Sequence, residues 1–199
     1  MNPTLWMVLS IALAIAVVCV GCRSAAVSGG GLIGAHDLAL ARSAPADVPP
    51  PPAGSETEKA AVARFVDFYR EYSTASIRRG VRDLYAYDAY FGDPFKGVTG
   101  IDAIEAYFLR MAEPVVACTF VVTSVSRTAE GEYFIPWVMD LTVKHAKKNP
   151  LRALGVSHVR FNAQGQVIFQ QDYWDSSVLF ERLPVVGVLT RYVKRRLED

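Results

Sequence analysis

The spacing of apolar residues predicts three helices over residues 55–112. Ser55 and Glu58 form an S-x-x-E capping box, which marks the start of a helix. The apolar residues after this box recur on one helical face, Val62, Phe65, Val66 and Tyr69, so this face is expected to be buried. A second, shorter helix is predicted over about residues 76–85, and a third over about residues 101–112, before Pro114.

A short strand with a carboxylate at its end lies between the second and third helices. Phe91 and Asp93 share a face at the two-residue period of a strand. Pro94 ends this strand because proline cannot donate to the ladder, and Thr99 and Asp102 then form a T-x-x-D helix start. By itself, Asp93 fits two roles: a turn former or cap before proline, or a functional carboxylate that the next helix covers.

From residue 115 onward the pattern changes to period two. It predicts strands over residues 115–126, 133–143, 154–161 and 166–174. The basic segment 144–149 is interpreted as a solvated turn. Helices followed by a run of antiparallel strands predict an α+β fold, in which the helices pack on one curved, mainly antiparallel sheet.

The N-terminal segment is almost entirely apolar from Leu5 to Val20. It is shorter than the roughly 20 residues of a membrane span and suits the core of a signal peptide. The residues around Cys22 resemble a bacterial lipoprotein cleavage box, which would leave Cys22 lipidated. A short uncleaved anchor is the alternative. Either reading of residues 1–22 predicts an exported, membrane-anchored protein of the cell envelope.

Two further segments flank the predicted domain, which covers residues 55–183. Residues 23–54 are rich in Ala, Gly, Ser and Pro, and this composition predicts a disordered tether. Residues 184–199 are predicted to form a basic amphipathic helix that contains Arg191, Lys194, Arg195 and Arg196. These cations either complement the helix dipole or bind anionic lipid.

Composition excludes several classes of function. The 21 basic and 20 acidic residues nearly cancel, so no basic excess points to nucleic acid. The three cysteines make no disulfide framework, and Cys118 is expected to be a buried, inert thiol. No metal or cofactor is predicted, because His36, His145 and His158 are scattered without ligand spacing. His145 falls in the basic turn, and His158 is expected to point away from any cavity.

Two motifs carry a resemblance to a known family. The first comprises Tyr85, Ala86, Asp88, Ala89, Asp93, Pro94, Phe95, Gly100, Ile104, Tyr107 and Phe108. The second comprises Arg160, Phe161, Asn162, Gly165 and residues 171–175, QDYWD. Together they resemble the nuclear transport factor 2 superfamily, in its SnoaL-like and ketosteroid isomerase-like branches, over roughly residues 56–183. The resemblance implies a cone-shaped fold and a homodimer formed through the open face of the sheet.

The same resemblance implies an apolar cavity for a small hydrophobic molecule. Its concave surface would hold Phe65, Phe91, Asp93, Ile135, Trp137, Met139, Ser157, Asp172 and Trp174. Such a mixture of apolar and few polar side chains is common in ligand sites. Burial and mutual repulsion would keep one aspartate neutral. We therefore predict Asp93 as a general base and Asp172 as an acid or orienting group.

The helper residues of the related enzymes are not matched. Asp93 falls where ketosteroid isomerases keep the aspartate that moves the proton. Their oxyanion-hole tyrosine falls on Phe65 and their protonated aspartate on Ser157. Asp172 matches the first aspartate of a similar segment in limonene epoxide hydrolases, but their paired arginine and aspartate fall on Trp137 and Met139.

Three functions therefore stay open. The aspartates form their own acid–base pair for isomerase or hydrolase chemistry on a small apolar substrate; the cavity only binds a ligand; or the domain is a scaffold for a protein partner. The first two differ in whether Asp93→Asn abolishes turnover or only alters affinity. The scaffold predicts a poorly formed pocket and a contiguous apolar surface patch.

Overall fold

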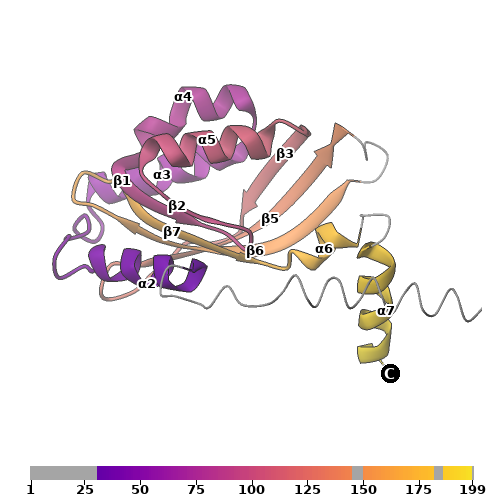
Figure 1. Ribbon diagram of the computed structural model, residues 1–199. Helices are drawn as coiled ribbons and strands as arrows, with labels where there is room; N and C mark the ends of the chain where they lie inside the picture. The colour runs from indigo at the N-terminus through magenta and orange to yellow at the C-terminus, as the bar shows by residue number, and fades with distance from the viewer. Residues whose placement is uncertain (1–30, 145–149, 182–185, 199) are drawn as a thin grey trace, which may run out of the picture. The chain divides into compact units, whose positions relative to one another are not determined.

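The computed structural model describes residues 31–144, 150–181 and 186–198 (Figure 1). The chain divides into two compact units, residues 1–35 and 36–199. Of the first unit, only residues 31–35 are described, and they include the start of helix α2 (Leu32–Arg42). The sheet and the other described helices all belong to the second unit.

Three helices form close to their predicted positions: α3 (Glu56–Arg70), α4 (Thr74–Leu84) and α5 (Ile101–Ala112). Ser55 caps α3 as predicted, because its hydroxyl accepts a hydrogen bond from the Glu58 N–H. The predicted cap of α5 by Thr99 and Asp102 is wrong. Helix α5 starts instead after Gly100, whose φ of 90° suits glycine, and Asp102 pairs with Arg82 on α4.

One curved sheet contains the seven strands that the described residues form. They are β1 (Tyr85–Gly92), β2 (Gly97–Thr99), β3 (Val115–Val122), β4 (Ser126–Arg127), β5 (Tyr133–Val143), β6 (Leu151–Phe161) and β7 (Val167–Trp174). Their order is β2-β1-β7-β6-β5-β3, with β4 paired to β5. All pairs are antiparallel except β1 with β7. This arrangement of helices and strands confirms the predicted α+β fold with a mainly antiparallel sheet.

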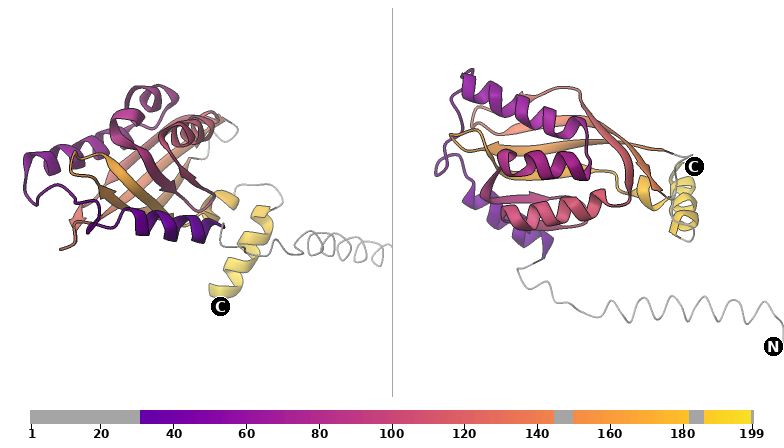
Figure 2. Two further views of the ribbon diagram at one scale, coloured as in Figure 1. Left: turned by 60° about the vertical axis from the view of Figure 1, so that its left-hand side comes forward. Right: turned by 90° about the horizontal axis from the view of Figure 1, so that it is seen from above.

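Helices α3, α4 and α5 lie side by side over one face of the sheet (Figure 2). The main core fills the space between them and contains Phe65, Leu84, Phe91, Phe108 and Phe161, each less than 5% exposed. A smaller apolar cluster continues along the same face between β3, β5 and β6, with Cys118, Trp137 and Met139 at its centre. The candidate site lies where these two clusters meet.

The prediction of a disordered tether over residues 23–54 is wrong for residues 32–42, which form α2. Arg160 of β6 holds this helix by donating to the Leu40 carbonyl and to the Ser43 hydroxyl, at 2.6 Å and 3.1 Å. The His36 ring packs edge-on against Phe169 of β7. Side-chain partners on the sheet therefore order a segment whose composition alone predicts flexibility. The earlier part of the predicted tether, before residue 31, lies outside the described residues.

Two short elements follow the sheet, α6 (Ser177–Phe180) and α7 (Val186–Glu198). Helix α7 falls in the segment where a basic amphipathic helix is predicted. Among the described residues, none of the helices has the length and apolar character needed to cross a bilayer. The apolar run from Leu5 to Val20, Cys22, and most of the basic turn with His145 lie outside the described residues.

Candidate functional site

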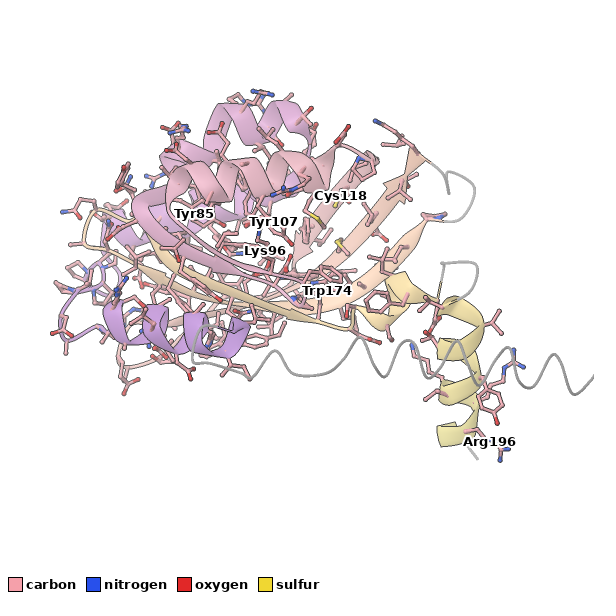
Figure 3. The ribbon with its side chains drawn as sticks, in the orientation of Figure 1. Tyr85, Lys96, Tyr107, Cys118, Trp174 and Arg196 are labelled. Carbon is pink, nitrogen blue, oxygen red and sulfur yellow. The ribbon has the colours of Figure 1, made fainter. Side chains whose placement is uncertain are left out.

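A cavity of about 120 Å³ lies between α5, the end of β1 and the smaller apolar cluster. Tyr107 of α5, Cys118 of β3 and Trp174 of β7 flank it (Figure 3). The other lining residues are mainly aromatic or aliphatic, Tyr69, Tyr72, Phe91, Asp93, Phe95, Phe108, Met111, Val115, Phe120, Trp137, Met139, Leu141, Asp172 and Leu179. The two aspartates are thus the only carboxyl groups among the described residues of this mainly aromatic and aliphatic wall.

Asp172 is buried on the inner face of β7. Its Oδ1 accepts hydrogen bonds from the Ser157 hydroxyl at 2.6 Å and from the Gln170 amide at 2.8 Å. Its Oδ2 accepts none from the described residues. Burial raises the pKa of Asp172 to about 7, with a further contribution from the charge of Asp93, although the two hydrogen bonds oppose this rise. A neutral Asp172 would carry its proton on Oδ2, because Oδ1 is already an acceptor.

Asp93 follows β1 and has a different environment. Its Oδ1 accepts from the backbone N–H groups of Phe95 and Lys96, each at 2.8 Å, which is the geometry of a turn cap. Its Oδ2 accepts the Tyr107 hydroxyl at 2.7 Å. Asp93 therefore fills both roles that the sequence allows, since it shapes the turn before Pro94 and also lines the cavity. Burial, followed by the bond to Asp93, raises the pKa of Tyr107.

A buried series of hydrogen bonds connects Asp172 through Gln170 to two tyrosines, Tyr85 and Tyr69. The Gln170 carbonyl oxygen accepts the Tyr85 hydroxyl at 2.6 Å, and the Tyr85 and Tyr69 hydroxyls lie 2.7 Å apart. Burial raises the pKa of both tyrosines well above the usual range, so both stay neutral. The Gln170 amide is thereby oriented with its N–H toward Asp172.

Trp137 contributes to the hydrogen bonding of Asp172 through Ser157. Its indole N–H donates to the Ser157 hydroxyl at 3.0 Å, and that hydroxyl in turn donates to Asp172. The ring lies against Gly155 on the neighbouring strand, and a Cβ at this glycine would come within 2.2 Å of it. Gly155 is therefore the residue that leaves room for the Trp137 ring.

The structure brings six of the nine predicted pocket residues to the cavity: Phe91, Asp93, Trp137, Met139, Asp172 and Trp174. Phe65 and Ser157 line instead a small adjoining void of about 10 Å³, together with Trp137 and Asp172. Ile135 lines neither space and is fully buried in the main core. Its place in the pocket was therefore wrongly predicted, because strand period gives the face and not the depth along it.

Sequence reasoning missed several polar residues of the site. Gln170 is two residues before Asp172, so period two places both on one face. Tyr69 is one turn after Phe65 on α3, and it supplies a buried hydroxyl that Phe65 lacks. Tyr107 lies one helical turn from Ile104 on the buried face of α5. Only its bond to Asp93 reveals its place in the site.

The remaining candidates, Cys118 and His158, form no hydrogen bond with Asp93 or Asp172 among the described residues. Cys118 is buried as predicted, and burial raises the pKa of its thiol to about 12. His158 points to the opposite face of the sheet, as predicted, where it stacks on Phe134. Burial lowers the pKa of His158. Among the described residues, no group of three or more His, Cys, Asp or Glu side chains could hold a metal ion.

The fold and the site define a class of protein: an α+β domain whose curved sheet and covering helices enclose an apolar cavity with two buried aspartates. The SnoaL-like domain family matches residues 62–169, and the chain belongs to this family. A comparison with curated proteins finds no match.

Solved structures share the fold at low sequence identity. A Jannaschia sp. CCS1 protein named for its resemblance to SnoaL-like polyketide cyclases has a TM-score of 0.56 and 16% identity, covering 66% of this chain and 96% of that one. An LEH-like epoxide hydrolase from M. tuberculosis has a TM-score of 0.51 and 14% identity, covering 69% and 96%. A protein with a ketosteroid isomerase-like fold from Catenulispora acidiphila, solved with trimethylamine, has a TM-score of 0.51 and 17% identity, covering 60% and 88%.

Proposed function

We propose that this domain binds a small apolar molecule with a carbonyl group and catalyses proton transfer at the carbon next to it. The observation that carries the proposal is Asp172, a buried carboxyl group that lines an apolar cavity, whose Oδ2 accepts no hydrogen bond from the described residues and whose pKa lies near 7. A group with such a pKa can donate or accept a proton at neutral pH. The family and its neighbours, which include proteins named as isomerase-like, cyclase-like and epoxide hydrolase-like, support this class of chemistry.

Each aspartate has a distinct role in this mechanism. Neutral Asp172 donates a hydrogen bond from Oδ2 to the carbonyl oxygen of the ligand. Asp93 takes the proton from the adjacent carbon, so the C–H electron pair moves toward the carbonyl and an enol-like species forms. Return of the proton from Asp93 to a different carbon gives the isomer. Asp172 stabilises the negative charge that develops on the carbonyl oxygen. Electrostatic stabilisation of this kind is usually the largest single contribution to lowering the activation barrier of an enzymatic reaction.

The cavity volume limits the ligand. At about 120 Å³ it is comparable to the roughly 150 Å³ cavity that accepts benzene in another protein. A single ring or a short branched chain therefore fits without rearrangement, whereas a steroid does not. Cyclic enones with one ring are the natural test compounds.

The test is deuterium incorporation into a panel of one-ring enones in D₂O, followed by NMR. We expect the Asp172→Asn and Asp93→Asn variants to exchange these carbons about 100-fold more slowly than the wild type. Asp88→Asn, which changes an exposed carboxylate on β1, is the matched control and should exchange like the wild type. If Asp172 is the acid, exchange catalysed by the wild type decreases above pH 7. A decrease below pH 7 would instead assign Asp172 as the base.

A non-catalytic binding protein is the second candidate, and one observation favours it. Both oxygens of Asp93 are already occupied by the turn N–H groups and by Tyr107, as expected for a structural carboxylate. This function predicts that the enones bind in the cavity but exchange no faster than in buffer. It also predicts that Asp93→Asn changes their affinity and nothing else.

We propose further that residues 1–22 export the protein and anchor it in the cell envelope, with lipidation at Cys22. The apolar run from Leu5 to Val20 and the small residues before Cys22 support this. Mass spectrometry of the N-terminal peptide from membrane-extracted protein is the test. An acylated Cys22 at the new N-terminus is expected. An intact Met1 terminus would support an uncleaved anchor instead.

A further inference from the structure

Helix α7 presents an apolar face that nothing in the described structure covers. Val186, Val188, Tyr192 and Val193 are each between 43% and 61% exposed. At 100° per residue they lie on one side of the helix. This is a large exposed apolar surface for a helix of 13 residues.

The opposite side of α7 faces the domain. Lys194 forms ion pairs there with Asp175 and with Glu181, and Gly187 is buried. Lys194 is therefore engaged in holding α7 against the segment that follows β7. The exposed valines and Tyr192 point elsewhere, so they do not contribute to this attachment.

Two arginines accompany the apolar face near the end of α7: at 100° per residue, Arg195 lies at its edge and Arg196 lies within it, between Tyr192 and Val193. Arg195 and Arg196 are exposed, and neither forms an ion pair with any carboxylate whose side chain the structure describes. Arg196 lies over the Tyr192 ring at 5.7 Å, on the part of α7 remote from α6 (Figure 3). An arginine that packs on an exposed aromatic ring keeps its charge available to an anionic partner.

We propose that α7 is an interfacial helix that docks on an anionic lipid bilayer. Exposed valines and a tyrosine beside unpaired arginines match the chemistry of the boundary between headgroups and acyl chains. A helix of 13 residues is about 20 Å long, which is too short to cross the roughly 30 Å hydrocarbon core. Helix α7 therefore lies in the plane of the interface.

Docking of α7 has a consequence for the cavity. Leu179 of α6 forms part of the cavity wall, and Phe180 packs edge-on against Phe95 on another part of that wall. Only seven positions along the chain separate Leu179 from Val186. A bilayer-bound α7 would therefore hold this wall close to the phase in which apolar molecules concentrate. The docking itself does not depend on the proposed catalysis.

The experiment is hydrogen–deuterium exchange of the full chain, read by mass spectrometry on the peptide that covers residues 186–198. Reading this peptide separates α7 from any membrane binding by the N-terminal segment. The protein is measured with phosphatidylglycerol–phosphatidylcholine vesicles, with pure phosphatidylcholine vesicles and without lipid. We expect protection of residues 186–198 with the anionic vesicles only, and loss of that protection in high salt.

Charge-reversal variants test the arginines. Arg195→Glu/Arg196→Glu should weaken binding to the anionic vesicles, and the protection with it, by at least about 30-fold, because each basic residue near an anionic surface contributes roughly fivefold in binding. Arg78→Glu/Arg79→Glu, on exposed positions of α4, makes the same change in net charge and should keep the protection.

Three results would overturn the proposal. The first is unchanged exchange of residues 186–198 while the protein is bound to anionic vesicles. The second is equal protection on neutral vesicles. The third is protection that rises with protein concentration in the absence of lipid, which would assign the face to a second copy of the chain.

Discussion

Burial of the Asp172 carboxyl group has a cost to folding. Its carboxyl group is buried in the native state with a pKa of about 7, compared with its ordinary value of 3.8. The folded protein therefore holds a proton on Asp172 between about pH 4 and pH 7 that the unfolded chain releases. As pH rises through this window, ionisation of the buried group destabilises the fold, and above pH 7 the full penalty is present.

The loss of stability with rising pH can be measured against a variant that cannot ionise at position 172. The free energy of unfolding of the wild type should fall between pH 4 and pH 7 relative to that of Asp172→Asn, by an amount on the order of 4 kcal/mol. Asparagine keeps an acceptor for Ser157 and Gln170 but cannot ionise. Urea denaturation at a series of pH values measures the difference. Parallel pH profiles for the two proteins would show that Asp172 is solvated.

Tyr107 offers a second prediction at the same scale. Tyr107→Phe removes the only side-chain donor that Asp93 has among the described residues and leaves a buried carboxylate oxygen without its partner. We expect a loss of about 1.5–3 kcal/mol in the free energy of unfolding. Tyr87→Phe, at an 81% exposed position, is the control and should be neutral. Equal effects of the two substitutions would mean that the Tyr107–Asp93 bond does not form in solution.

Arg160 of β6 attaches helix α2 to the sheet through hydrogen bonds. Arg160 is 8% exposed; it forms an ion pair with Glu132 and donates to the Leu40 carbonyl at the end of α2. Cations at a helix C-terminus are favoured by the unpaired carbonyl groups there. One side chain of the sheet thus provides the C-terminal cap of a helix 117 or more residues earlier in the chain.

Arg160→Gln should therefore release α2. We expect faster amide exchange over residues 36–43 and a loss of about 3–5 kcal/mol in stability, because Glu132 keeps a partly buried charge without its partner. Arg152→Gln on the same strand removes an arginine whose side chain is 73% exposed and should leave both quantities unchanged. Protection of residues 36–43 in the Arg160 variant would show that α2 is held by other contacts.

The outer face of the sheet has a set of exposed apolar residues that could contact a second molecule. Val121, Leu154 and Tyr173 are exposed there on β3, β6 and β7. Val138 pairs with both Val121 and Leu154, so these apolar positions are continuous across the strands. Because α2 occupies the neighbouring surface around Phe169, a partner copy would have to use this remaining part.

We predict a homodimer through this surface. Leu154→Glu, at a position that is 72% exposed, should shift the full chain toward the monomer in analytical ultracentrifugation, because a buried unpaired charge is strongly unfavourable in an interface. Val125→Glu introduces the same charge in the loop between β3 and β4 and should not change the molecular mass. A wild-type chain that sediments as a monomer at every concentration would contradict the prediction.

The sequence by itself determined the order and type of most elements. Periodicity is a local property, so the burial of Phe65 on α3, the break at Pro94 and the strand that contains Asp172 follow from neighbouring residues alone. The resemblance of the two motifs added the family, which the match over residues 62–169 confirms. The same resemblance implied a cavity that holds both Asp93 and Asp172.

Only the tertiary structure decided how the two aspartates differ. The pKa of Asp172 depends on its burial among residues from several separate elements, and the orientation of Asp93 depends on Tyr107 from the next helix. The order of α2 likewise depends on Arg160, which no local pattern connects to it. Hydrogen bonds and desolvation act between residues that are distant in the chain, so their effects become visible only after folding brings those residues together.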